Sequence, residues 1–139
     1  FEFTGQMGCF ESKDYNNFEL GTALVNRDVA KANRIVKHFG ANPKNYPLAA
    51  TIPMLYRLFS KVMGCYFAPS DSPEVLAQTI GVSKFFVKDY ATGKRNFSKR
   101  QVFNIISHLN EYDLKSKGYG NTTTSEGELL KELVFKILH

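Results

Sequence analysis

The basic side chains that could bind an anion are concentrated in one short stretch of the sequence. Six cationic residues lie in residues 84–100, with Asp89 as the one acidic residue among them, and they are Lys84, Lys88, Lys94, Arg95, Lys99 and Arg100. This stretch carries the whole formal charge of +5, because basic and acidic residues balance in the rest of the chain. Localised positive charge is typical of a site for nucleic-acid phosphates or an acidic partner. A solvated surface helix would have the same composition, so both interpretations remain.

Residues that could catalyse a reaction are scattered along the chain. His38, His108 and His139 fall in three different predicted elements, and neither Cys9 nor Cys65 has a partner at metal-ligand spacing. The sequence has no Gly-x-x-x-x-Gly-Lys phosphate loop and no His-Glu-x-x-His pair. We therefore expect a non-catalytic chain with no catalytic residue, no cofactor and no metal.

Length and composition predict one globular domain. The chain has 139 residues, of which 43% are hydrophobic, enough for a substantial core. Arg57 and Lys61 interrupt its most apolar stretch, residues 46–67, so we expect no membrane span. Two cysteines do not form a disulfide framework, and the N-terminus lacks the features of a signal peptide, so we expect a cytoplasmic protein. The chain begins at Phe1 without an initiator methionine, which suggests a fragment of a longer protein, and processing would have the same result.

Apolar residues recur at helical spacing through most of the chain, and alternation typical of strands is absent. The expected helices span approximately residues 17–26, 29–39, 47–67, 73–80, 84–92, 99–117 and 126–138. Their starts carry good capping residues, including the capping boxes Ser98–Gln101 and Ser125–Glu128. The sequence predicts an all-α bundle of six or seven helices, with residues 47–67 as its central helix.

Several residues give more detailed expectations. Gly40, Gly81 and Gly93 are expected to end helices. Phe18 is expected on the inner face of the first helix, and Pro53 should bend the central helix or delay its start. The apolar residues of the last helix cover about half of its circumference, so we expect it to be packed on more than one side.

Residues 72–100 also have the pattern of a helix-turn-helix. A short helix, Gly81, an apolar residue and the capping residue Ser83 precede a second helix. A DNA reader exposes polar side chains there, whereas this sequence has Phe85 and Phe86. We expect these two rings to pack against a neighbouring helix, and a sequence-specific DNA-binding regulator remains the alternative function.

The order and spacing of several short segments resemble the C-terminal region of the DNA polymerase III delta subunit. The resemblance covers residues 15–139, and the segments in chain order are Asn17-Phe18-Glu19-Leu20, Lys31-Ala32-Asn33-Arg34-Ile35, Gly81-Val82, Phe85-Phe86-Val87-Lys88, Arg95-Asn96-Phe97-Ser98, Leu109-Asn110-Glu111-Tyr112-Asp113 and Gly127-Glu128-Leu129-Leu130-Lys131-Glu132-Leu133. Residues 121–139 look most like the members from Bacteroidetes.

The resemblance implies a fold and a role. Residues 16–139 would form a helical collar, an oligomerisation domain that holds the clamp loader together through the other loader subunits, while residues 1–15 would be a remnant of the preceding domain or a linker. The sliding clamp would be gripped by a region before this domain, and the assembly would act on primed DNA. The long helix 98–117 and the last helix would supply subunit contacts. The resemblance carries no site residue over, so for the six cations of residues 84–100 both interpretations remain: contact with the DNA backbone or an acidic loader subunit, or a solvated surface.

Overall fold

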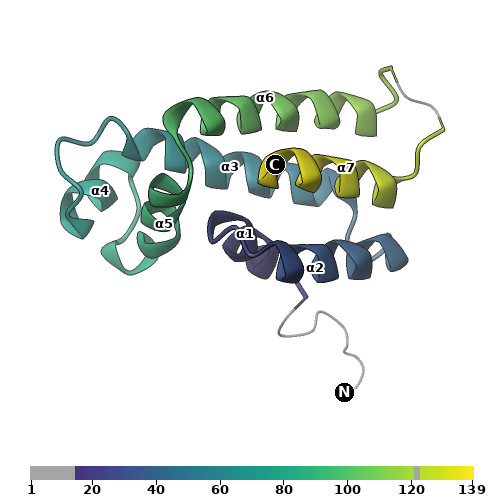
Figure 1. Cartoon of the computed structure of the whole chain (residues 1–139), viewed down its shortest axis with the longest axis horizontal. Helices are drawn as coiled ribbons and strands as arrows, with labels where there is room; N and C mark the ends of the chain where they lie inside the picture. Colours follow the sequence, from purple (N-terminus) through teal and green to yellow (C-terminus); the bar gives the residue numbers. More distant parts are fainter. Residues whose placement is uncertain (1–14, 121–122) are drawn as a thin grey trace.

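A computed structural model describes residues 15–120 and 123–139 of the chain. Within these residues the structure has seven α-helices, one 3-10 turn and no strand, which confirms the all-α bundle (Figure 1). The elements are α1 (Asn17–Val25), α2 (Val29–Ala41), α3 (Leu48–Cys65), α4 (Pro73–Ile80), the 3-10 turn η1 (Lys84–Phe86), α5 (Lys88–Asn96), α6 (Lys99–Ser116) and α7 (Glu126–Leu138). The expected linker or remnant, residues 1–15, lies outside the described residues except for Tyr15.

Side-chain caps fix the helix starts where the sequence places them. Asn16 Oδ1 accepts a hydrogen bond from the Glu19 backbone N–H at 2.8 Å, and it begins α1. Ser98 and Gln101 form both bonds of a capping box at the start of α6. Each cap satisfies an N–H group that the helix itself cannot bond, so these residues determine where a helix begins.

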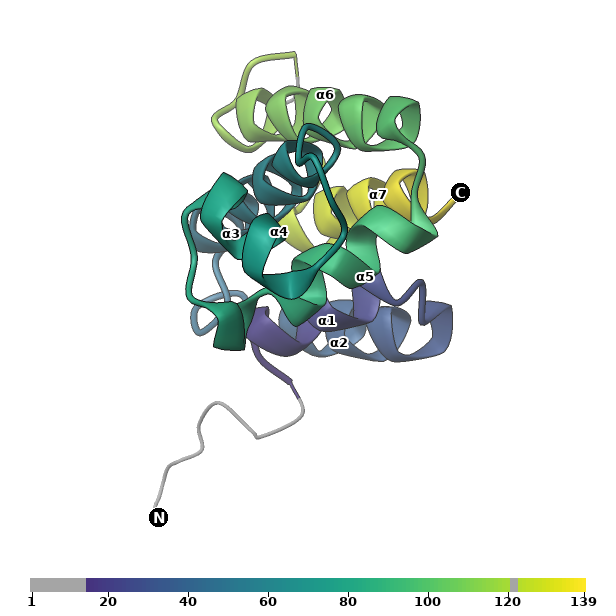
Figure 2. The ribbon, with the colours of Figure 1, turned by 90° about the vertical axis from the view of Figure 1, so that its left-hand side faces the viewer.

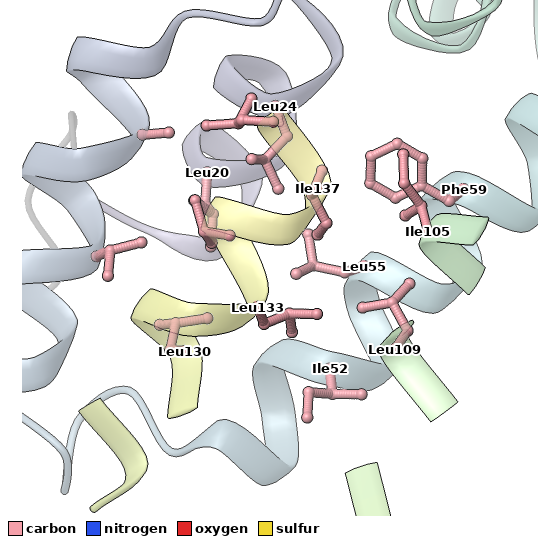
Figure 3. Packing of buried hydrophobic residues seen from close by; sticks show 14 of the residues in the cluster. Leu20, Leu24, Ile52, Leu55, Phe59, Ile105, Leu109, Leu130, Leu133 and Ile137 are labelled. Carbon is pink, nitrogen blue, oxygen red and sulfur yellow. The ribbon is translucent and has the colours of Figure 1, made fainter. Parts of the chain in front are cut away.

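One large core lies between α1, α2, α3, α6 and α7, which we call the main core (Figure 3). Helix α3 packs against α6, and α7 packs against both α2 and α6. Six side chains of α7 are buried, which agrees with the expectation that this helix is packed on more than one side: Leu129, Leu130, Leu133, Val134, Ile137 and Leu138.

The elements α4, η1 and α5 form one end of the molecule, which we call the corner (Figure 2). A second, smaller core lies within it and against α3. Its buried members are Cys65, Leu76, Ala77 and Val87. The corner is attached to the main core through its contact with α3 and through Arg27, whose guanidinium donates to the carbonyls of Asn96 at 3.1 Å and Leu138 at 3.0 Å.

The glycines do not all act as the sequence suggested. Gly81 does end α4, in the left-handed conformation with φ of 73°. Gly93, by contrast, is buried within α5, and a Cβ atom there would lie 2.8 Å from Val62 Cγ2 of α3. Gly40 also lies inside its helix, and its Cα would lie 3.0 Å from a Cβ at Gly127 of α7. These two expectations were wrong because close contact between helices, rather than helix termination, accounts for both glycines.

Two further expectations need correction. Phe18 is 69% exposed, because Leu20, Ala23 and Leu24 already occupy the buried face of α1. Pro53 does not delay the start of the central helix, which begins at Leu48 and continues past the proline, so that alternative was wrong, whereas the bend stays a prediction.

None of the helices in residues 15–120 and 123–139 is long and apolar enough to cross a membrane.

Candidate functional site

The basic stretch 84–100 follows the path of the corner and ends in the first turn of α6. Gly81 turns the chain after α4, and Ser83 Oγ accepts a hydrogen bond from the Phe85 N–H at 3.3 Å, which starts η1. Helix α5 follows, Phe97 is buried, and Ser98 caps α6. The stretch is therefore three connected elements and not one solvated helix.

Two of the six cations are held by acidic residues that precede the stretch. Lys84 Nζ lies 2.7 Å from Glu74 Oε1 at the surface, and this hydrogen bond lowers the pKa of the Glu74 carboxyl. Lys94 Nζ pairs with the Asp71 carboxylate. Their charge is thus partly balanced by neighbours that lie outside the stretch.

Three cations gather at the junction of α5 and α6. Arg95 Nη2 donates to Thr92 Oγ1 at 3.2 Å, Lys99 Nζ lies 4.3 Å from the centre of the Phe67 ring, and Arg100 is exposed. The Tyr66 hydroxyl donates to the Phe97 carbonyl and so fixes the end of α3 beneath this junction. We call Arg95, Lys99 and Arg100 the junction cations.

The start of α6 differs electrostatically from those of α4 and α7. Helices α4 and α7 carry glutamates in their first turns, whereas the first turn of α6 has no acidic residue and begins with Lys99 and Arg100. Cations are unfavourable at the positive end of a helix dipole. The combined field of the dipole and these two side chains favours an anion at this end.

The structure does not bring all six cations together. Lys88 begins α5 and Arg95 lies near its end, about 10 Å apart along the helix axis at a rise of 1.5 Å per residue. Lys88 lines a groove with residues of α1 and α3 instead. The stretch therefore divides into the junction cations and a separate part around Lys84 and Lys88.

Phe85 and Phe86 are the clearest departure from expectation. They are 90% and 69% exposed, so the expected packing against a neighbouring helix was wrong. In a three-residue 3-10 turn one side faces the helices beneath it, and Val82 and Val87 occupy that side. The two rings face the groove that Lys88 lines, together with Phe18.

Residues of the kinds used in catalysis are engaged in packing. His38 stacks on Tyr15 with ring centres 4.8 Å apart and meets Tyr46 edge-on at 5.3 Å. Cys65 is fully buried, and burial raises the pKa of its thiol, which keeps it in the less reactive form. In the described part of the chain no group of three or more His, Cys, Asp or Glu side chains could hold a metal ion.

Comparison with known proteins assigns this fold. Residues 14–135 match the family described as DNA polymerase III delta subunit, C-terminal domain. The chain belongs to this family. No curated protein matches the sequence. The structure is similar to the DNA clamp loader delta protein (YqeN) of Bacillus subtilis, with a TM-score of 0.68 and 25% sequence identity. The match covers 91% of this chain and 37% of that protein.

The corner of this delta-subunit domain differs from a helix-turn-helix reader. In such a reader the second helix follows the turn directly and presents polar side chains to the base edges. Here η1 and Val87 separate the turn from α5, and Phe85 is the most exposed of the large hydrophobic side chains in the described residues. Phenylalanine has no hydrogen-bonding group with which to distinguish bases, which argues against the alternative function.

Three features of the delta-subunit domain were missed in the sequence. Asp71 and Glu74 pair with Lys94 and Lys84, but they lie outside the stretch over which charge was counted. Phe18 approaches η1 only because α1 packs beside α5. A charge count over a wider window would have found the two acids, whereas no local pattern indicates the groove.

Proposed function

We propose that this domain joins its delta subunit to the other subunits of a clamp loader, as a non-catalytic assembly module. The observation that carries the proposal is the family match over residues 14–135. The similarity to a clamp loader delta protein, which extends over 91% of this chain, supports it independently.

Exposed apolar side chains on α6 and α7 support subunit contact through these helices. Phe103 and Leu114 of α6 and Phe135 of α7 are more than half exposed. Covering a large apolar side chain of this kind is worth about 1.5–3 kcal/mol. A partner subunit that buries several of them would gain substantial affinity.

Reconstitution of the loader tests this proposal. The full-length protein is mixed with the purified loader subunits of the same organism, and assembly is followed by size-exclusion chromatography. We expect the wild-type protein to enter the complex and Phe103→Ser with Phe135→Ser to weaken its incorporation. Both side chains are exposed, so the variant should retain its fold. Failure of the wild-type protein to assemble would refute the proposal.

We also propose that the junction cations Arg95, Lys99 and Arg100 contact the DNA backbone within the assembled loader. The acid-free start of α6 supports this role, because it combines two cations with the positive end of a helix dipole. Backbone contact needs positive charge in the right place and does not need base recognition. Lys84 and Lys94 are already paired with acids, and Lys88 faces the groove, so we assign them no phosphate contact.

Charge reversal tests the DNA contact. The affinity of the assembled loader for primed DNA should fall as salt rises. Arg95→Glu, Lys99→Glu and Arg100→Glu together should make this negative slope of log affinity against log salt shallower by about 2–3. The matched control reverses three exposed cations of α2 and the following loop, Arg34, Lys37 and Lys44, and should leave the slope unchanged. An unchanged slope in the first variant would remove this proposal, and binding that depends on duplex sequence would favour the DNA reader.

The sliding clamp enters the proposal through the parts of a delta subunit that this domain does not contain. The B. subtilis relative extends well beyond the matched region, which covers 37% of its length. We assign the clamp contact to that remainder and to residues 16–139 the role of collar, in the cytoplasm where DNA replication takes place.

A further inference from the structure

A groove lies where α1, α3 and the corner meet. Its volume is about 470 Å³, and its apolar lining consists mainly of Phe18, Met54, Leu58, Phe85 and Phe86, which we call the aromatic groove. Met54 and Leu58 are half-buried side chains of α3 that pack against the main core, whereas the three phenylalanines are largely exposed. An exposed apolar surface with three aromatic rings is typical of a protein-binding site.

The charges around the aromatic groove indicate the chemistry of its partner. Both acidic residues that line it are engaged: Glu19 pairs with Lys31 at 2.7 Å, and Asp89 accepts a hydrogen bond from the Thr22 hydroxyl at 3.2 Å. Arg57 and Lys88 also line the groove, are exposed, and make no ion pair with any residue of 15–120 or 123–139. The Thr22 hydroxyl does not neutralise Asp89, so the lining charges outside the Glu19–Lys31 pair are two positive and one negative, and their sum is positive.

We propose that the aromatic groove binds an amphipathic helix of a neighbouring clamp-loader subunit, with apolar side chains against the three phenylalanines and acidic side chains facing Arg57 and Lys88. The inference rests on the proposed function, since it assumes that the domain sits among other loader subunits. It adds a second contact surface, formed by α1, α3 and the corner instead of α6 and α7. An amphipathic helix in an apolar groove is a recurrent mode of protein recognition.

Single-stranded DNA is the other ligand that aromatic and basic side chains could bind, by base stacking. The lining argues against it, because Glu19 is paired with Lys31, Asp89 keeps its negative charge, and Arg57 and Lys88 then leave a net charge of only about +1 for a strand that carries one negative charge per nucleotide. Lys84, the next cation along the chain, is held by Glu74. A partner with a mixed apolar and acidic surface fits this arrangement better than a polyanion does.

The decisive variant replaces two exposed rings. Phe85→Ser with Phe86→Ser in the full-length protein should raise the dissociation constant for the remaining loader subunits by about tenfold or more, as expected for aromatic residues at the centre of an interface. Tyr119→Ser is the matched control, since Tyr119 is 67% exposed and lies beyond the end of α6, and it should bind like the wild type. Circular dichroism and thermal unfolding confirm that each variant is folded.

The charge part of the proposal has its own variant. Arg57→Glu with Lys88→Glu should weaken the same association and reduce its dependence on salt, because the attraction to acidic side chains is lost. A benzoylphenylalanine at position 86 should crosslink to a neighbouring loader subunit, and mass spectrometry of the product identifies the helix. A crosslink within the same chain would overturn the proposal.

The outcomes separate this inference from the proposed function. If the wild-type protein assembles and Phe85→Ser with Phe86→Ser assembles equally well, the aromatic-groove proposal is wrong and the assembly role stands. If the wild-type protein does not assemble, both are wrong. If the variant assembles normally but loses binding to an oligo(dT) strand in fluorescence anisotropy, the groove binds single-stranded DNA and the proposal is overturned.

Discussion

The main core and the corner are joined along α3, yet they bury and expose different kinds of side chain. The main core draws on five helices and consists mostly of leucine, isoleucine, valine and phenylalanine. The corner closes over four buried residues and exposes Phe85 and Phe86. It also carries or adjoins all six cations of residues 84–100.

The main core and the corner therefore have different roles: the first stabilises the fold, and the second carries side chains that can contact a partner. A large aliphatic core supplies most of the free energy of folding, because apolar burial is its dominant favourable contribution. The corner buries too little to add much, but its attachment to α3 gives its exposed side chains fixed positions. The corner therefore presents the exposed aromatic and basic side chains, and the more stable main core holds the corner in place.

The largest expected effect is in the main core. Phe59 is fully buried on α3, and its ring meets that of Phe97 edge-on at 5.9 Å between centres. Phe59→Ala should lower the free energy of unfolding by about 3–5 kcal/mol, because it leaves a large cavity. Urea unfolding followed by circular dichroism measures this loss.

Leu76→Ala is the matched change in the corner. Leu76 is as well buried as the core leucines, but it belongs to the small cluster. We expect a loss of about 2 kcal/mol, at the lower end for such substitutions, because fewer neighbours surround the cavity. A loss at Leu76 near the upper end of the range for buried leucines, about 5 kcal/mol, would contradict the division into a strong and a weak unit.

A smaller effect is expected where the two units touch. Gly93→Ala places a Cβ 2.8 Å from Val62 Cγ2, so either the Val62 side chain must shift or α5 must move away from α3. We expect a loss of about 1–3 kcal/mol from overpacking. In a Cys9→Ser background the reactivity of Cys65 toward a thiol reagent should also rise, since the only remaining thiol lies beneath the corner.

Val62→Ala provides the control for this contact. It removes the two nearest methyl groups that the new Cβ would meet and leaves Val25 Cγ1 at 3.3 Å, so the double variant Val62→Ala with Gly93→Ala should lose less stability than the two single variants combined. Strict additivity would show that Gly93 is required for a reason other than its approach to α3.

The smallest effect is expected at the surface pair of Glu74 and Lys84. The hydrogen bond from Lys84 lowers the pKa of Glu74 below its ordinary value of 4.5, so the carboxylate stabilises the folded state above that pH. This contribution is lost as the pH falls through the lowered pKa. Glu74→Gln should therefore lower the Tm slightly at pH 7 and leave it unchanged well below pH 4.5, as measured by differential scanning calorimetry. A difference that persists in acid would contradict the assignment to this pair.

Most of the helices were predictable because their signals are local. The caps Asn16 and Ser98 act on N–H groups within three residues, and the apolar stripe of α6 repeats at helical spacing. The prediction of a helix over residues 84–92 was less accurate. The observed helix α5 begins at Lys88, after η1, and ends at Asn96. The sequence predicts that Gly93 ends this helix, but the role of Gly93 depends on Val62, thirty-one positions earlier in the chain.

The candidate site was predictable as a composition and not as an arrangement. Counting charges found the six cations but not their grouping. In the structure Glu74 and Asp71 pair with two of them, and Lys88 lies far from Arg95 along α5. Phe85 and Phe86 were expected inside because exposing two aromatic rings is costly. Their exposure beside Phe18 depends on how α1 packs next to the corner.

The sequence by itself determined the all-α fold, the starts of its helices and the family to which the chain belongs, because these follow from caps, periodicity and the order of short segments. Only the tertiary structure decided which apolar residues remain at the surface and which cations are already paired. Those properties depend on residues far apart in the chain that meet through packing. The charge of +5 is therefore a property of the sequence, whereas the junction cations and the aromatic groove are properties of the fold.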